Sequence, residues 1–238
     1  MYNIPLNTIP YMLGALATLV VGIRSTQKYK QLHTPLLRHF AISGFLACAG
    51  MALLSVSYLL PINQATLKFL LIIGRACLDM VAYLQVYLIW YLTPLKKYSI
   101  WWLVVSLVPI AMVGYYFQVN AFIYDFTGII NNQVVFTVPK PTTYTHAFSL
   151  LIVFCAGLVL FKNAFEQTDN RSKLRLFSVG LLYVAASLSD LYNTIFLAGQ
   201  SNSWIVLIGF AIASGVFLFT TLLLFKRDKR TVENLSAK

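Results

Sequence analysis

Hydrophobic residues gather into seven runs along the chain, and short polar segments separate each run from the next. A run of about 20 apolar residues is long enough to cross a hydrocarbon core of roughly 30 Å as an α-helix. The pattern therefore predicts an all-α membrane protein, a seven-transmembrane helix bundle that fills residues 1–226. We place its helices at residues 5–24, 37–60, 66–92, 99–118, 145–163, 173–198 and 203–226.

Composition agrees with a chain whose main solvent is lipid. Hydrophobic residues make up 59% of the 238 positions and charged residues only 11%. The net charge of +11 lies almost entirely in the connections between the apolar runs. A nucleic-acid-binding face would mix basic with polar and aromatic residues on a folded surface, so we expect membrane lipids and no nucleic acid as partners.

The basic residues also predict the orientation of the chain. The connections after the first, third and fifth runs, together with the C-terminal tail, contain fifteen of the Lys and Arg residues. Because basic connections are retained in the cytoplasm, the N-terminus is expected outside and the tail, residues 227–238, in the cytoplasm.

The connection at residues 119–144 is the longest that we expect on the outer side. Its β-branched residues flank Asn131 and Asn132, and Pro139 and Pro141 follow. This pattern predicts either a short β-hairpin over the outer end of the bundle or an irregular connector.

Three ionisable residues are expected near the middle of the bilayer: Arg75, Asp79 and Asp190. Arg75 and Asp79 are one helical turn apart, and Asp190 lies at a similar depth in the sixth helix. Burying a charge in a membrane is costly unless it is paired, so we expect these three groups to pair inside the bundle. Further polar residues of the third and sixth helices extend this network, namely Tyr83, Tyr87, Tyr183, Ser187 and Asn193.

This network has three possible roles. It is a structural lock between the third and sixth helices, a ligand pocket or switch that opens toward the outside, or part of a proton or ion path. A path needs polar groups in the inner half of the bundle as well, and there we expect Gln85 to be nearly alone.

Residue inventory argues against catalysis and against bound cofactors. A retinal Schiff base needs a lysine deep in a helix, and residues 203–225 contain none. His33 and His39 are expected near the cytoplasmic side and His146 near the outer side, so they cannot share one metal ion. We expect no enzymatic activity, no catalytic residues, no cofactor and no metal site.

The fifth connection and the tail form a basic cytoplasmic surface that includes Arg171, Lys173, Arg175, Lys226 and Arg227. These residues either set the topology and attract anionic lipid or form a docking surface for a cytoplasmic signalling partner.

The layout resembles the seven-helix sensor region at the N-terminus of some bacterial histidine kinases. The likeness covers nearly the whole chain. It is carried by Arg38 at the start of the second helix, by YTHAFSLLIVFCAGLVLF, by RSKLRLFSVGLL after a basic turn, and by Asn193 late in the sixth helix. The resemblance implies a multi-pass protein of the bacterial plasma membrane that detects a signal. It differs in that only KRDKRTVENLSAK follows the last helix, where such proteins continue into a kinase or another output domain.

We therefore expect a receptor-like, signal-sensing membrane protein that acts through a separate partner. A ligand entering the outer half of the bundle would perturb Arg75, Asp79 and Asp190 and shift the third and sixth helices. The alternatives are a small transporter or channel and a structural accessory subunit of a membrane complex.

Overall fold

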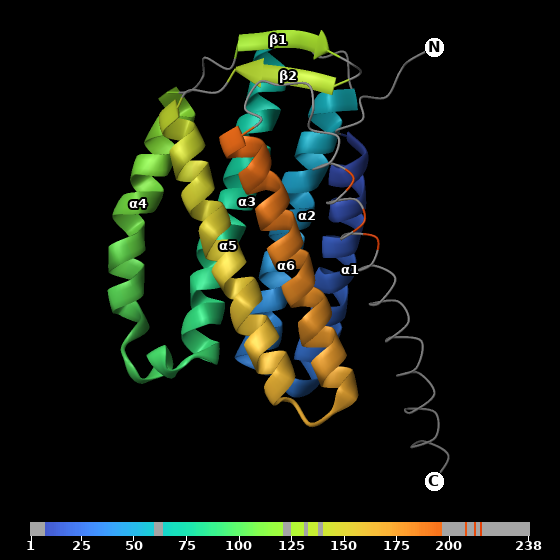
Figure 1. The fold of residues 1–238 in the computed structure, drawn as a ribbon, viewed down its shortest axis with the longest axis vertical. Coiled ribbons are helices and arrows are strands. Elements are labelled where there is room, and N and C mark those ends of the chain that lie inside the picture. Colours follow the sequence, from blue (N-terminus) through green and yellow to red (C-terminus); the bar gives the residue numbers. More distant parts are fainter. Residues whose placement is uncertain are drawn as a thin grey trace.

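The computed structural model describes residues 8–59, 64–120, 125–130, 133–137 and 140–196, together with residues 208, 212 and 215. These residues form a bundle of long helices with a short 3-10 helix, η1, and a two-stranded hairpin at one end (Figure 1). The helices are α1 Thr8–Leu32, α2 Pro35–Leu59, α3 Gln64–Leu92, η1 Pro94–Lys97, α4 Ile100–Asn120, α5 Lys140–Glu166 and α6 Asn170–Phe196. The helix predicted at residues 203–226 lies outside the described residues, apart from those three positions.

Five of the helices are long and apolar enough to cross a membrane, in agreement with the prediction of a helical, multi-pass membrane protein. These spans are Thr8–Leu32, Pro35–Ser57, Phe69–Leu92, His146–Glu166 and Asn170–Tyr192. In α4 the apolar stretch found among the described residues is the shorter Ile100–Pro109. Large apolar side chains lie on the outside of the bundle, such as Leu16 at 52% and Val105 at 63% exposure. An exterior of this kind is stable in lipid and would aggregate in water.

The turn between α1 and α2 is formed by only two residues. The backbone N–H of His33 donates to the carbonyl of Tyr29 at 2.8 Å, and His33 has a φ of 51°, which ends α1 in a left-handed conformation. Pro35 then begins α2 at a position where a missing N–H costs nothing. The sequence predicted that the first helix ends near residue 24, but the polar residues beyond it continue the helix to Leu32.

Asp169 caps the start of α6 and so closes the turn after α5. Its carboxylate accepts hydrogen bonds from the backbone N–H of Ser172 at 2.9 Å, from the Ser172 hydroxyl at 2.8 Å and from the N–H of Arg171 at 3.3 Å. These donors, the Ser172 hydroxyl first, lower the pKa of Asp169 because they stabilise its charged form. A negative charge here also suits the positive end of the helix dipole.

The connection for which we predicted a hairpin or an irregular connector contains two antiparallel strands, β1 Asp125–Ile130 and β2 Gln133–Thr137. Phe126 is paired with Phe136, and the register becomes irregular between Phe126 and Gly128. Because α4 continues to Asn120 and α5 begins at Lys140, the connection is shorter than predicted. The hairpin lies at the opposite end of the bundle from the α1–α2 and α5–α6 turns and η1 (Figure 1).

Pairs of glycines bring neighbouring helices into backbone contact. The pairs are Gly22 with Gly44 between α1 and α2, Gly50 with Gly74 between α2 and α3, and Gly157 with Gly180 between α5 and α6. A Cβ added to Gly44 would lie 2.7 Å from the backbone nitrogen of Gly22. Close approach through small residues is a common way to join helices in membranes, where lipid removes the hydrophobic drive for association.

Five of the helices, α1, α2, α3, α5 and α6, line one cavity. α1 packs on α2, α2 on α3, α3 on α5, and α5 on α6, whereas α4 lies at the edge against α3 and α5. α6 in turn contacts α1 where Ala17 of α1 meets Leu182 of α6, with Val21 and Val179 packed around them.

Candidate functional site

A histidine lies between the two carboxylates of the predicted network. Nδ1 of His146, on α5, lies 3.4 Å from a carboxylate oxygen of Asp79 on α3, and Nε2 lies 3.0 Å from an oxygen of Asp190 on α6. His146 is 5% exposed and Asp79 8%, whereas the side chain of Asp190 is 36% exposed. One imidazole therefore connects three helices in a mostly buried site.

The chemistry of these contacts depends on one proton. A carboxylate only accepts hydrogen bonds, and a neutral imidazole donates from only one of its two nitrogens. A protonated His146 donates to both acids. A neutral His146 donates to one acid and accepts from the other, which must then carry the proton. Among the described residues no group of His, Cys, Asp or Glu side chains has an arrangement that could hold a metal ion.

Arg75 belongs to the same electrostatic group. It lies one turn before Asp79 on α3, and its charge acts on His146. The sequence led us to expect a direct triad of Arg75, Asp79 and Asp190, and the structure places His146 between the two acids. We had placed His146 at the very start of a helix beginning near residue 145. Since α5 begins at Lys140, His146 instead lies about 9 Å into the helix.

Two serines continue the polar surface next to His146. Ser149, one turn further along α5, is buried and forms a hydrogen bond with Tyr83, one turn from Asp79 on α3. Ser187, one turn before Asp190 on α6, donates to the backbone carbonyl of Tyr183 at 2.6 Å. Tyr83, Tyr183 and Ser187 therefore lie near the predicted site, although Ser187 is satisfied within its own helix.

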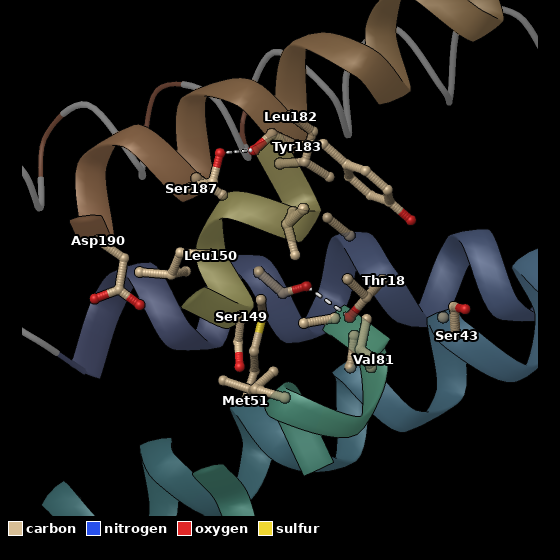
Figure 2. A pocket seen from close by; sticks show the side chains of 18 of the residues that line it. Thr18, Ser43, Met51, Val81, Ser149, Leu150, Leu182, Tyr183, Ser187 and Asp190 are labelled. Carbon is tan, nitrogen blue, oxygen red and sulfur yellow. Dashed lines mark hydrogen bonds between the residues drawn. The ribbon is translucent and has the colours of Figure 1, made fainter. Parts of the chain in front are cut away.

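These groups line one part of a cavity of about 190 Å³ between α1, α2, α3, α5 and α6. Most of its wall is apolar and includes Ala17, Val21, Leu150 and Leu182. Figure 2 shows Asp190 at one end of the cavity and Ser43 at the other, with apolar side chains together with Ser149 and Thr18 between them. The cavity therefore has a mostly apolar wall with a few polar groups along it.

The half of the bundle nearer the α1–α2 turn, which we predicted to be the inner half, is more polar than expected. Gln85 is fully buried on α3, and its carbonyl oxygen lies 3.3 Å from Nε2 of His39 on α2. Its amide nitrogen donates to the carbonyl of Val81 at 2.9 Å and lies 3.5 Å from the Ser43 hydroxyl. The expectation that Gln85 is nearly alone was wrong, because the packing of α2 against α3 brings His39 and Ser43 to it from 46 and 42 residues away.

The remaining predicted residues lie apart from the cavity or outside the described part of the chain. Tyr87 packs against His39 with ring centroids 5.3 Å apart and stacks on Tyr91 at 5.9 Å, so it belongs to an aromatic group near the end of α3 that leads into η1. Asn193 lies in α6, and its side chain is not among those described.

Three of the five predicted docking residues lie at the start of α6, at the end of the bundle opposite the hairpin (Figure 1). Arg171 is exposed, and Lys173 and Arg175 are partly exposed. Lys226 and Arg227 lie outside the described residues.

The signal for His146 was present in the sequence. It is a histidine at the start of a predicted apolar helix, and a histidine inside such a helix needs a partner as much as a carboxylate does. Its link to Asp79 depends on α5 packing against α3, which no local pattern predicts. Comparison of the chain with protein-family models, curated proteins and solved structures found no match, so the functional argument rests on these residues.

Proposed function

We propose that the protein is a receptor-like membrane sensor whose ligand binds in the cavity beside His146, Asp79 and Asp190. The observation that carries this proposal is the position of His146, which contacts α3 and α6 from α5 and also forms part of the cavity wall. A ligand that competes for either carboxylate would change the contacts that hold three helices together.

The same helices lead to the basic end of the bundle. α6 begins beside Arg171, Lys173 and Arg175, and α3 leads into η1 with Lys96 and Lys97. A shift of α3 or α6 would therefore move basic residues available to a cytoplasmic partner. The ligand must bind the two arrangements of the helices with different affinity, since otherwise it shifts nothing.

Seven spans, an outer N-terminus and a cytoplasmic tail are part of this proposal. The α1–α2 turn, η1 and the α5–α6 turn share one end of the bundle and carry basic residues, which supports placing that end in the cytoplasm (Figure 1). The resemblance to sensor regions of bacterial histidine kinases supports a plasma-membrane location and a signalling partner encoded separately.

A second candidate, a small transporter or proton path, gains support from the group of His39, Ser43 and Gln85. Ser43 lines the same cavity as Asp190, so polar groups lie toward both of its ends. Most of the wall between them is apolar, and an apolar wall offers few hydrogen-bond partners to a continuous chain of water. Proton flux into vesicles reconstituted with the protein would favour this candidate over a sensor.

Ligand-dependent stability tests the sensor proposal. A ligand that binds only the folded protein at about 100 times its Kd raises stability by about 2.7 kcal/mol. We expect at least one compound of a panel of lipids and small amphiphiles to raise the thermal unfolding temperature of the detergent-purified protein. Ala186→Leu, which fills the cavity wall, should abolish the shift, whereas Ala49→Leu on the exposed face of α2 should retain it. The proposal fails if no compound shifts the wild type, or if Ala186→Leu responds as the wild type does.

A further inference from the structure

The charges around the cavity identify a class of ligand. We propose that the cavity binds a small organic cation with an apolar body, whose positive charge lies against Asp190 and Asp79. This inference rests on the ligand-binding role proposed above and names the chemistry of the ligand.

The first step is the charge balance of the site. Two carboxylates, Asp79 and Asp190, and one imidazole, His146, line the cavity, and the Arg75 charge acts on the imidazole. With a neutral imidazole these four groups carry one net negative charge. A net charge in a low-dielectric site is costly, so one further positive charge stabilises the site. A proton on His146 supplies it in the free protein, and a bound cation can supply it in the complex.

The second step is access to the carboxylates. Both acids line the cavity, but the side chain of Asp79 is 11% exposed whereas that of Asp190 is 36% exposed. The 3.0 Å contact from Nε2 of His146 is therefore made to the more accessible acid. A cation entering the cavity meets Asp190 first and can replace the imidazolium as its partner. An anion would meet the Asp190 carboxylate first and is disfavoured by its charge.

The third step is the size and polarity of the rest of the cavity. An apolar cavity of about 150 Å³ holds one benzene ring, and this cavity measures about 190 Å³. One ring or a branched alkyl group, joined by a short chain to an amine, matches that volume. The apolar wall near Ala17 and Leu182 would surround the ring, and the amine would point toward Asp190.

Exchange of one positive charge for another links binding to protons. Around His146 the charged or titratable groups are Arg75, Asp79 and Tyr83 on α3 and Asp190 and Tyr183 on α6, and Tyr11 of α1 also lines the cavity. Histidine is the side chain that ordinarily changes charge between pH 5 and 8. A cation that displaces the His146 proton should release up to about one proton on binding, and its affinity should rise by at most about tenfold per pH unit.

Three probes with the same ring and different polar groups test the ligand class: phenethylamine, phenethyl alcohol and phenylacetate. Binding to the full chain in detergent is measured by isothermal titration calorimetry. We expect the amine to bind about tenfold to a hundredfold more tightly than the alcohol, because it adds a charge-assisted hydrogen bond. Asp190→Asn should reduce amine binding to the level of the alcohol. Asp169→Asn removes an exposed carboxylate at the far end of α6 from Asp190 and should leave amine binding unchanged.

The outcomes separate this inference from the broader proposal. If the alcohol or phenylacetate binds as tightly as the amine, the cation assignment is wrong while a ligand role for the cavity stands. If no probe binds, the cation assignment fails, and the lipid and amphiphile panel decides the ligand role.

Calorimetry in buffers with different ionisation enthalpies then counts protons. The exchange is supported if the wild type releases protons when the amine binds and His146→Gln does not. It is refuted if the wild type releases no protons.

Discussion

Gly44→Ala tests the close packing of α1 and α2. The added Cβ would lie 2.7 Å from the backbone nitrogen of Gly22, 2.9 Å from its Cα and 2.9 Å from the carbonyl oxygen of Thr18. These are all backbone atoms of α1, so no side chain can rotate to make room. To reach an ordinary contact of 3.4 Å the two helices must separate locally by about 0.7 Å.

The expected cost follows from two opposing effects. Overpacking that moves backbone costs about 1–3 kcal/mol, and three clashing backbone atoms place Gly44→Ala near the upper end, about 3 kcal/mol. The gain in helix propensity from glycine to alanine opposes this by about 1 kcal/mol. We therefore expect Gly44→Ala to lower the free energy of unfolding by about 2 kcal/mol.

Two other glycines provide matched controls. A Cβ at Gly22 meets the ring of Phe45 at 3.1 Å and its backbone nitrogen at 3.2 Å, and this ring can turn because Phe45 is 42% exposed. Among the described residues nothing lies within 4 Å of a Cβ at Gly215. Unfolding by sodium dodecyl sulfate in mixed micelles, followed by circular dichroism, should rank Gly44→Ala as the least stable, then Gly22→Ala, then Gly215→Ala. Equal stability of Gly44→Ala and Gly215→Ala would refute the packing argument.

Three further predictions concern other parts of the bundle. Gly50→Ala brings a Cβ to 2.8 Å from the carbonyl oxygen of Gly74 and should also lower stability by about 1–2 kcal/mol in the same micelle assay. Gln85→Leu removes the partner of His39 and should cost about 1 kcal/mol, and combined with His39→Leu it should cost less than the sum of the single changes. Asp169→Ala removes the cap of α6. Because the pKa of Asp169 is lowered on folding, the capping contribution is present above the unfolded pKa of about 3.9 and is lost as the pH falls through the folded value. The difference in melting temperature between wild type and Asp169→Ala should therefore be largest at neutral pH and should shrink as the pH is lowered. A difference that stays constant with pH would contradict the capping assignment.

Length and hydropathy were enough to predict the six long helices that the structure describes, because a membrane span needs a long apolar run and leaves a clear signal. The ends of the helices were less predictable. α1 and α5 both extend beyond their apolar runs. In α1 the helix that has started continues through polar residues that favour it, whereas α5 starts earlier than predicted with Pro141 in its first turn, where the missing N–H of proline costs nothing. Hydropathy alone marks where lipid ends, and Tyr29, Lys30 and Gln31 belong to a part of α1 that the apolar pattern does not include.

The candidate site was partly predictable for a different reason. The cost of burying charge identified Asp79 and Asp190 as residues that need partners, and their depth along the helices placed them near each other. His146 was harder to identify as a further partner, because Arg75 alone already offers the acids an opposite charge. Only the packing of α5 against α3 and α6 shows that His146 lies between the acids. The contacts of Gln85 with His39 were unpredictable for the same reason, since they join residues 46 positions apart.

The glycine pairs and His146 together indicate where the bundle can change shape. Backbone contacts through glycines tie α1 to α2, α2 to α3, and α5 to α6. In the part of the chain that the structure describes, no such pair joins α3 to α5, and α1 meets α6 through Ala17 and Leu182. The bundle therefore consists of two tightly packed groups, α1–α3 and α5–α6, and the cavity lies between them. His146 bonds Asp190 within its own group and Asp79 across the boundary, where the distance is the longer, 3.4 Å against 3.0 Å. A ligand that alters this histidine would act on the weaker of the two contacts, and the expected motion is a relative shift of the two groups with the packing inside each preserved.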